Sequence, residues 1–104
     1  LLYLPNKQNR VDLNALMTEL GKEGIDSILL EGGAILNECA LQCGIVNKLL
    51  VYIAPKIFGG SQSKSPVEGK GVAMANEAYR LYLNGVKTIG QDILLEYDVK
   101  KAGE

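Results

Sequence analysis

The chain contains no histidine. Ser-His-Asp triads and zinc sites with imidazole ligands are therefore excluded within these residues, because both need the histidine ring. Cysteine is scarce as well: there are two, Cys39 and Cys43, four positions apart. One helical face can hold both thiols, but two ligands make a poor zinc site. The pattern favours two small buried hydrophobic residues in a reducing compartment, so we expect a cytoplasmic protein with no metal.

Long apolar runs and an excess of one charge are missing too. No stretch approaches the roughly 18 apolar residues that span a bilayer. The start, LLYLPNKQNR, lacks the basic region and the apolar length of a signal peptide. The net charge is −1 and the Lys and Arg residues are scattered, which argues against a nucleic-acid surface. We expect neither membrane nor nucleic acid as a partner.

What is present is the composition of a soluble globular protein. The chain has 104 residues, of which 47% are hydrophobic and 22% charged. This length corresponds to about one domain with one modest core. Because the chain begins with Leu1 rather than Met, we expect a piece cut from a longer protein, either a single domain or part of one.

The first half of the chain alternates between strand and helix patterns. Strand-like runs are rich in β-branched and apolar residues, and helix-like runs carry apolar residues at helical spacing. The order is the end of a strand (1–5), a helix (11–24), a strand buried on both faces (25–31), a helix (34–43) and a strand ended by a proline (45–55). Such alternation predicts an α/β fold with parallel pairing and right-handed crossovers.

The two helices have recognisable ends. Asp12 or Asn14 is a suitable N-cap for the first, and Gly21 or Gly24 is a suitable stop. The second helix ends before Gly44. Helical spacing predicts that one side of this second helix collects the apolar residues Ile35, Leu36, Cys39, Ala40 and Cys43.

The second half of the chain begins with a change in amino-acid composition. Residues 56–78 are rich in Gly, Ser and Lys, which predicts an irregular surface loop that is mobile over 60–78. Two strands then follow at 79–88 and 92–99, forming an antiparallel hairpin that turns at IGQD. Asn84-Gly85 offers a rival turn, but the later turn leaves two strands of useful length.

The segment ILLEGGAIL raises the question of function. Glu31 ends the apolar run 25–31, and Gly32 and Gly33 precede a helix. At the carboxyl end of a parallel strand, Glu31 would face a cleft, and the bare N–H groups of the next helix would attract a phosphate. A lone E-G-G is equally compatible with a tight turn and an acid that complements the helix dipole.

Several ordered strings resemble the reductase domain of the bifunctional riboflavin-biosynthesis deaminase–reductase, the RibD family. They are a helix after VDL, then ILLEGG, another helix, a strand ending YIAPKIFGG, and a closing IGQDILLEY. The resemblance covers nearly the whole chain and implies the C-terminal half of a dihydrofolate-reductase-like domain. It further implies NADPH-dependent reduction of the ribose of 5-amino-6-(5-phosphoribosylamino)uracil to the ribitylamino product.

The resemblance also assigns roles to residues. Gly32 and Gly33 match the glycines that cradle the NADPH phosphates, with a cis peptide as one option. Ala34 and Ile35 open the phosphate-facing helix, and Glu31 matches the acid beside the ribose of the substrate. No residue is assigned as catalytic. Positioning and electrostatics would supply the catalysis.

Other functions remain compatible with the sequence. One is a pteridine or dihydrofolate reductase of the same fold. Another is a non-catalytic fragment that acts only through strand pairing, and we expect the chain alone to be inactive. The C-terminal strands also predict a homodimer interface, because they are rich in the apolar and aromatic residues Tyr79, Tyr82, Leu83, Leu94, Leu95 and Tyr97.

Overall fold

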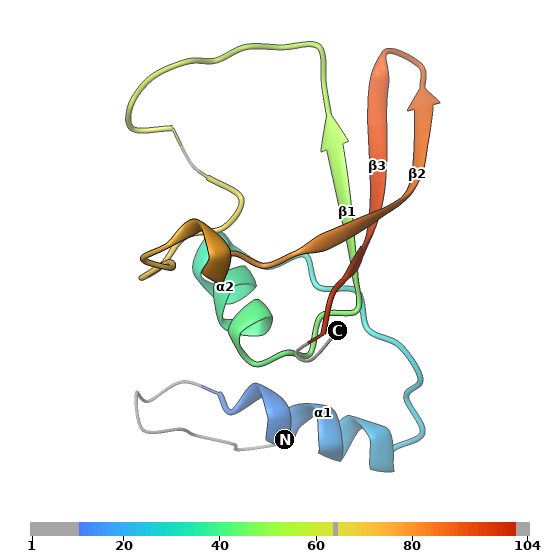
Figure 1. Cartoon of the computed structure of the whole chain (residues 1–104). Coiled ribbons are helices and arrows are strands. Elements are labelled where there is room, and N and C mark those ends of the chain that lie inside the picture. Colours follow the sequence, from blue (N-terminus) through green and yellow to red (C-terminus); the bar gives the residue numbers. More distant parts are fainter. Residues whose placement is uncertain (1–10, 64, 102–104) are drawn as a thin grey trace.

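The computed structural model describes residues 11–63 and 65–101. Its elements follow in the order α1 (Leu13–Lys22), α2 (Ala34–Gln42), β1 (Lys48–Ile53), the 3₁₀ turn η1 (Ala75–Glu77), β2 (Leu81–Ile89) and β3 (Asp92–Val99). The three strands form one sheet in the order β1-β3-β2, with α1 set apart from it and α2 beside the returning loop (Figure 1). The predicted α/β class is therefore confirmed. None of the helices so described is long and apolar enough to cross a membrane.

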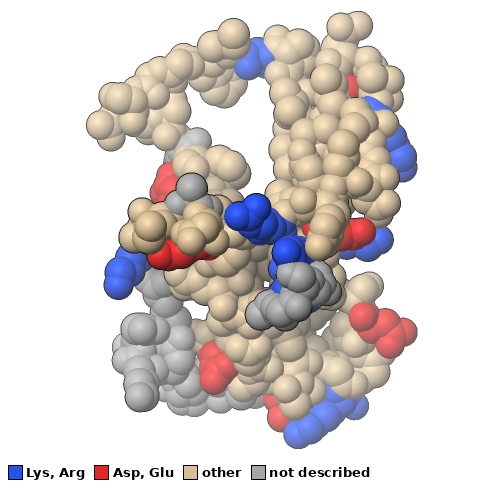
Figure 2. All heavy atoms as spheres, viewed as in Figure 1, with Lys and Arg blue, Asp and Glu red and all other residues tan. Residues whose placement is uncertain are grey.

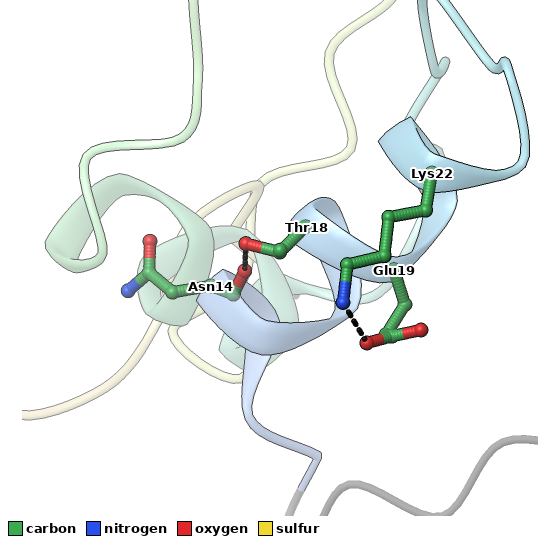
Figure 3. A network of polar contacts seen from close by, with 4 residues as sticks. All are labelled: Asn14, Thr18, Glu19 and Lys22. Atoms are coloured by element: carbon green, nitrogen blue, oxygen red, sulfur yellow. Dashed lines mark hydrogen bonds and ion pairs between the residues drawn. The ribbon is translucent and has the colours of Figure 1, made fainter.

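Helix α1 is specified by its own sequence. Asp12 is the N-cap, and its carboxylate accepts a hydrogen bond from the Ala15 N–H at 3.0 Å. Lys22 pairs with Glu19 at 3.1 Å, one turn away on the exposed face (Figure 3). Gly24 follows the helix with φ +83°, a conformation that favours glycine and ends the helical run. Asp12 and Gly24 were both among the residues predicted from the sequence to begin and end this helix.

The structure differs from the expectation at residues 25–31. This segment has no regular secondary structure, so the predicted central strand is wrong. The sheet pairs are both antiparallel, β1 with β3 and β2 with β3, and no parallel pair is found within 11–63 and 65–101. A strand needs a neighbour for its backbone groups, and no ladder in this part of the chain reaches 25–31. Leu29 is accordingly 72% exposed. The strand expected at 1–5 lies outside the described residues.

The C-terminal hairpin matches its prediction closely. β2 and β3 are antiparallel and turn at Gly90, whose φ is +61°. The rival turn at Asn84 has another structure: the register passes from Leu83 opposite Tyr97 to Gly85 opposite Glu96, which leaves Asn84 as a β-bulge. Asn84-Gly85 therefore bends β2 without ending it.

The loop between β1 and β2 is irregular, as expected, apart from η1. Its mobility stays a prediction. The part of this loop at 65–71 lies against α2. Its contact changes which residues of α2 are buried, compared with the face predicted from the sequence. Ile35 is 51% exposed, whereas Ala40 is fully buried and Glu38 is only 6% exposed. The covered side of α2 therefore keeps Ala40 and Cys39 of the predicted apolar face, adds Glu38, and leaves Ile35 and Cys43 exposed.

Burial in the described residues is limited. Ala40 and Leu94 are the hydrophobic residues classed as buried there. Cys39 is half-buried and Cys43 is exposed, so the expectation of two buried cysteines is wrong for Cys43. Periodicity defines a helical face, but the element that packs against the helix decides which face becomes buried.

Candidate functional site

The predicted phosphate site lies at the N-terminus of α2. Gly33 is the N-cap in an extended conformation, φ −67° and ψ 172°, and offers no side-chain cap. The first helical turn carries no acidic residue. The first hydrogen bond that closes the helix runs from the Asn37 N–H to the Gly33 carbonyl at 3.0 Å. The N–H groups before Asn37 therefore point out of the helix end, where its dipole is positive and favours an anion.

The two glycines are not equivalent. A Cβ at Gly32 would lie 2.5 Å from Cδ2 of Leu36, so a side chain there would require the Leu36 side chain to move. A Cβ at Gly33 would meet nothing within 4 Å. The space in front of Gly33 is therefore open, which is what close approach of a phosphate to the backbone needs. The cis peptide, which the resemblance offered as one option, is not found among the described peptide bonds.

The other predicted site residues surround this helix end. Ala34 is half-buried, while Glu31 and Ile35 are exposed. Glu31 belongs to neither of the two pockets described below, and the strand that was expected to aim it into a cleft is absent. The sequence places Glu31 beside the glycines, and the structure leaves its carboxylate accessible to a ligand. Its role remains a prediction.

The buried acid on α2, Glu38, was not predicted from the sequence. Glu38 is 6% exposed, and its Oε1 atom accepts hydrogen bonds from the Gly71 N–H and from Nε2 of Gln42, both at 2.9 Å. A buried carboxylate needs such partners because an unpaired one is costly. Only the spacing of Glu38 and Gln42, four positions apart, was a visible signal of an interaction on the helix.

Further hydrogen bonds join α2 to residues 65–71. The Glu68 N–H donates to the Ala34 carbonyl at 3.1 Å, and Nδ2 of Asn37 donates to the Pro66 carbonyl at 2.9 Å. The Glu68 carboxylate turns back to accept the Ser65 N–H at 3.0 Å. With the Glu38–Gly71 bond, these contacts hold the segment along the first half of α2, directly behind the open helix end.

An open pocket of about 460 Å³ lies between this segment and the start of β2. Glu38, Gly69, Gly71 and Tyr79 are among its lining residues. The pKa of Tyr79 is raised from its ordinary value of 10.0, chiefly by burial and further by the negative charges of Glu38 and Cys43. Within the ranges that the structure describes, no three Cys, Asp or Glu side chains gather as a metal site.

Comparison with known proteins shows which family the chain resembles in sequence and fold. The model of the RibD C-terminal domain family matches residues 2–95. The riboflavin biosynthesis protein RibD of Actinobacillus pleuropneumoniae is 50% identical over 93 residues, which are 89% of this chain and 25% of that protein. A 2,5-diamino-6-ribosylamino-4(3H)-pyrimidinone 5′-phosphate reductase of Methanothermobacter thermautotrophicus is 42% identical over 91 residues, 88% of this chain and 42% of that protein.

The fold agrees with the sequence comparison. A solved structure of Acinetobacter baumannii RibD superposes with a TM-score of 0.78 at 26% identity, covering 89% of this chain and 26% of that one. The fold expected from the resemblance is therefore confirmed. The chain spans about a quarter of the length of the RibD proteins and less than half of the archaeal reductase.

Proposed function

Because the chain belongs to the RibD C-terminal domain family, we propose that it forms part of an NADPH-dependent reductase of riboflavin biosynthesis. The proposed reaction reduces the ribose of 5-amino-6-(5-phosphoribosylamino)uracil to the ribitylamino product. The observation that carries this proposal is the open N-terminus of α2 at Gly33, within a chain that is 50% identical to a RibD protein over 93 residues.

The residues at this helix end fit the phosphates of a dinucleotide. Gly32 and Gly33 would let a phosphate reach the backbone, and the N–H groups that open α2 at Ala34 and Ile35 would donate to it. When bound, NADPH supplies the hydride. The chain's own contribution is to hold the phosphates and so fix the position of the cofactor, which is worth several kcal/mol where it aligns reacting groups.

Glu31 has a separate role in this proposal. Its exposed carboxylate adjoins Gly32, so it can accept hydrogen bonds from hydroxyl groups of the ribose while the phosphates lie on α2. Such bonds to a charged acceptor orient the substrate. Glu31 therefore acts as a substrate-binding residue.

A second substrate is favoured by one of the relatives. The archaeal protein is named as a reductase of 2,5-diamino-6-ribosylamino-4(3H)-pyrimidinone 5′-phosphate, which differs from the first candidate in the pyrimidine ring. The proposed chemistry at the ribose is the same for both. Comparing kcat/KM for the two compounds distinguishes them. We further propose a cytoplasmic homodimer, in which exposed Tyr82 and Leu83 on the outer strand β2 contribute to the interface.

The test is a fluorescence titration of the chain with NADPH. Gly33→Val adds a side chain whose Cβ meets no protein atom within 4 Å and which would fill the space in front of the helix end. We expect its NADPH affinity to fall at least about tenfold, equivalent to about 1.4 kcal/mol. Gly21→Val is the matched control, because a Cβ at Gly21 in α1 also meets nothing. Unchanged NADPH affinity in a folded Gly33→Val chain would overturn the phosphate cradle.

A further inference from the structure

Two cations oppose each other where the β2–β3 hairpin opens. The Lys100 N–H donates to the Arg80 carbonyl at 2.9 Å, continuing the register in which Leu81 pairs with Val99. Arg80 and Lys100 are therefore directly opposite across the two chain segments. Like charges in this arrangement destabilise a hairpin. The two ion pairs seen in the described residues, Lys22–Glu19 and Lys87–Glu96, do not involve them.

A third cation lies beside them for a different reason. Nζ of Lys101 donates to the carbonyls of Gly44 at 3.1 Å and Val46 at 2.6 Å, just beyond the C-terminal end of α2. These acceptors and the negative end of the helix dipole account for the position of Lys101. They do not account for Arg80 and Lys100, which lie opposite each other across the hairpin.

These three cations line one pocket of about 410 Å³. Gln42, Asn76 and Tyr79 also line it, and none of the described residues in its lining is Asp or Glu. The neighbouring pocket, by contrast, has Glu38 and Glu68 in its lining and, among the residues that the structure describes, no Lys or Arg. Basic atoms gather between the sheet and the α2 region near the centre of the face in Figure 2. Charge is thus segregated between two adjoining pockets, and this one is positive.

We propose that this positive pocket binds the phosphate group of a small organic phosphate. An anion between Arg80 and Lys100 would turn their repulsion into attraction, and a phosphate carries about −1.5 to −2 charges at neutral pH. The guanidinium of Arg80 can donate two parallel hydrogen bonds to it. The amides of Gln42 and Asn76 add donors, and the ring of Tyr79 gives an organic part a flat wall. The volume lies in the usual range for ligand sites, about 300–1,000 Å³.

This pocket is separate from the proposed cofactor site. Gly33 marks the N-terminal end of α2, and the pocket uses Gln42 and Gly44 at the other end. At a rise of about 1.5 Å per residue, a helix of this length separates the two by roughly 13 Å. Binding here therefore does not depend on the proposed reductase function.

The experiment is calorimetric titration of the chain with inorganic phosphate at constant ionic strength, together with thermal unfolding. Arg80→Gln and Lys100→Gln should each lower phosphate affinity at least about tenfold, while raising Tm in phosphate-free buffer because the repulsion is gone. Lys22→Gln, which removes an exposed cation of α1, is the control. It should neither lower the phosphate affinity nor raise Tm. The opposite signs of the two effects distinguish a ligand site from a general loss of stability.

The same titration on Gly33→Val separates the two sites. Phosphate binding that survives in Gly33→Val and is lost in Lys100→Gln supports the pocket, whatever happens to NADPH. Phosphate binding that does not saturate, that is equally weakened by Lys22→Gln, or that is unaffected by Arg80→Gln and Lys100→Gln would overturn the proposal.

Discussion

The buried carboxylate of Glu38 accepts the backbone N–H of Gly71 at 2.9 Å, across 33 positions of sequence. This bond ties the middle of α2 to the loop between β1 and β2. It also lies behind the open helix end at Gly33, so the packing of the loop supports the element that carries the proposed cofactor site.

Removing this acceptor should destabilise the chain. Glu38→Ala removes the charged acceptor of the Gly71 N–H, and a hydrogen bond to a charged group contributes about 1.5–3 kcal/mol. Glu38→Gln keeps an oxygen acceptor of the same shape and should lose less. The measurement is urea unfolding followed by circular dichroism, with hydrogen exchange at the Gly71 amide as the local readout. Equal stability and equal exchange in Glu38→Ala would show that the contact does not hold the loop.

Gly69 should be intolerant of any side chain. Its Cβ would lie 2.5 Å from Cδ of Glu38, and its φ of +156° is one that other residues rarely adopt. Gly69→Ala should therefore lower the unfolding midpoint. Gly21→Ala is the matched control: it has open space inside α1 and should raise stability by about 0.5–1 kcal/mol. The same substitution thus has opposite signs at the two positions, and a stabilising Gly69→Ala would contradict the packing described.

Tyr79 should release its proton at a higher pH than an ordinary tyrosine. Burial, then the charge of Glu38, raises its pKa above 10.0. The folded chain keeps the proton to a higher pH than the unfolded chain. The stability gained from the neutral ring is therefore fully present below pH 10.0 and is lost as the pH rises through the raised pKa.

Ultraviolet titration of the phenolates checks this prediction, with Tyr79→Phe used to identify the signal. Glu38→Gln should lower the pKa of Tyr79 only in part, because burial is the larger cause. A Tyr79 signal that titrates together with those of the other tyrosines would refute it.

Glu31→Gln should separate substrate binding from cofactor binding. The variant keeps the shape of the side chain and removes the charge that would accept ribose hydroxyl groups. We expect a loss of about tenfold or more in kcat/KM with NADPH affinity little changed, measured on an active reductase that contains this chain. If turnover equals that of the parent, Glu31 only complements the helix dipole.

Much of the local structure followed from neighbouring residues. Asp12 caps α1 because a short acceptor before an apolar helical pattern satisfies a free N–H. Gly90 turns the hairpin because its positive φ suits a tight connection. The motif Glu31-Gly32-Gly33 was recognisable for the same reason: its members adjoin in the chain, and the backbone alone brings them to the start of α2.

The tertiary structure decided what depends on distant partners. An apolar run such as 25–31 becomes a strand only beside another strand, and none pairs with it in the described residues. The loop at 65–71, and not periodicity, determined that α2 buries Glu38 and exposes Ile35. The opposition of Arg80 and Lys100 arises from the hairpin register, since residues 20 positions apart meet only when the ladder aligns them.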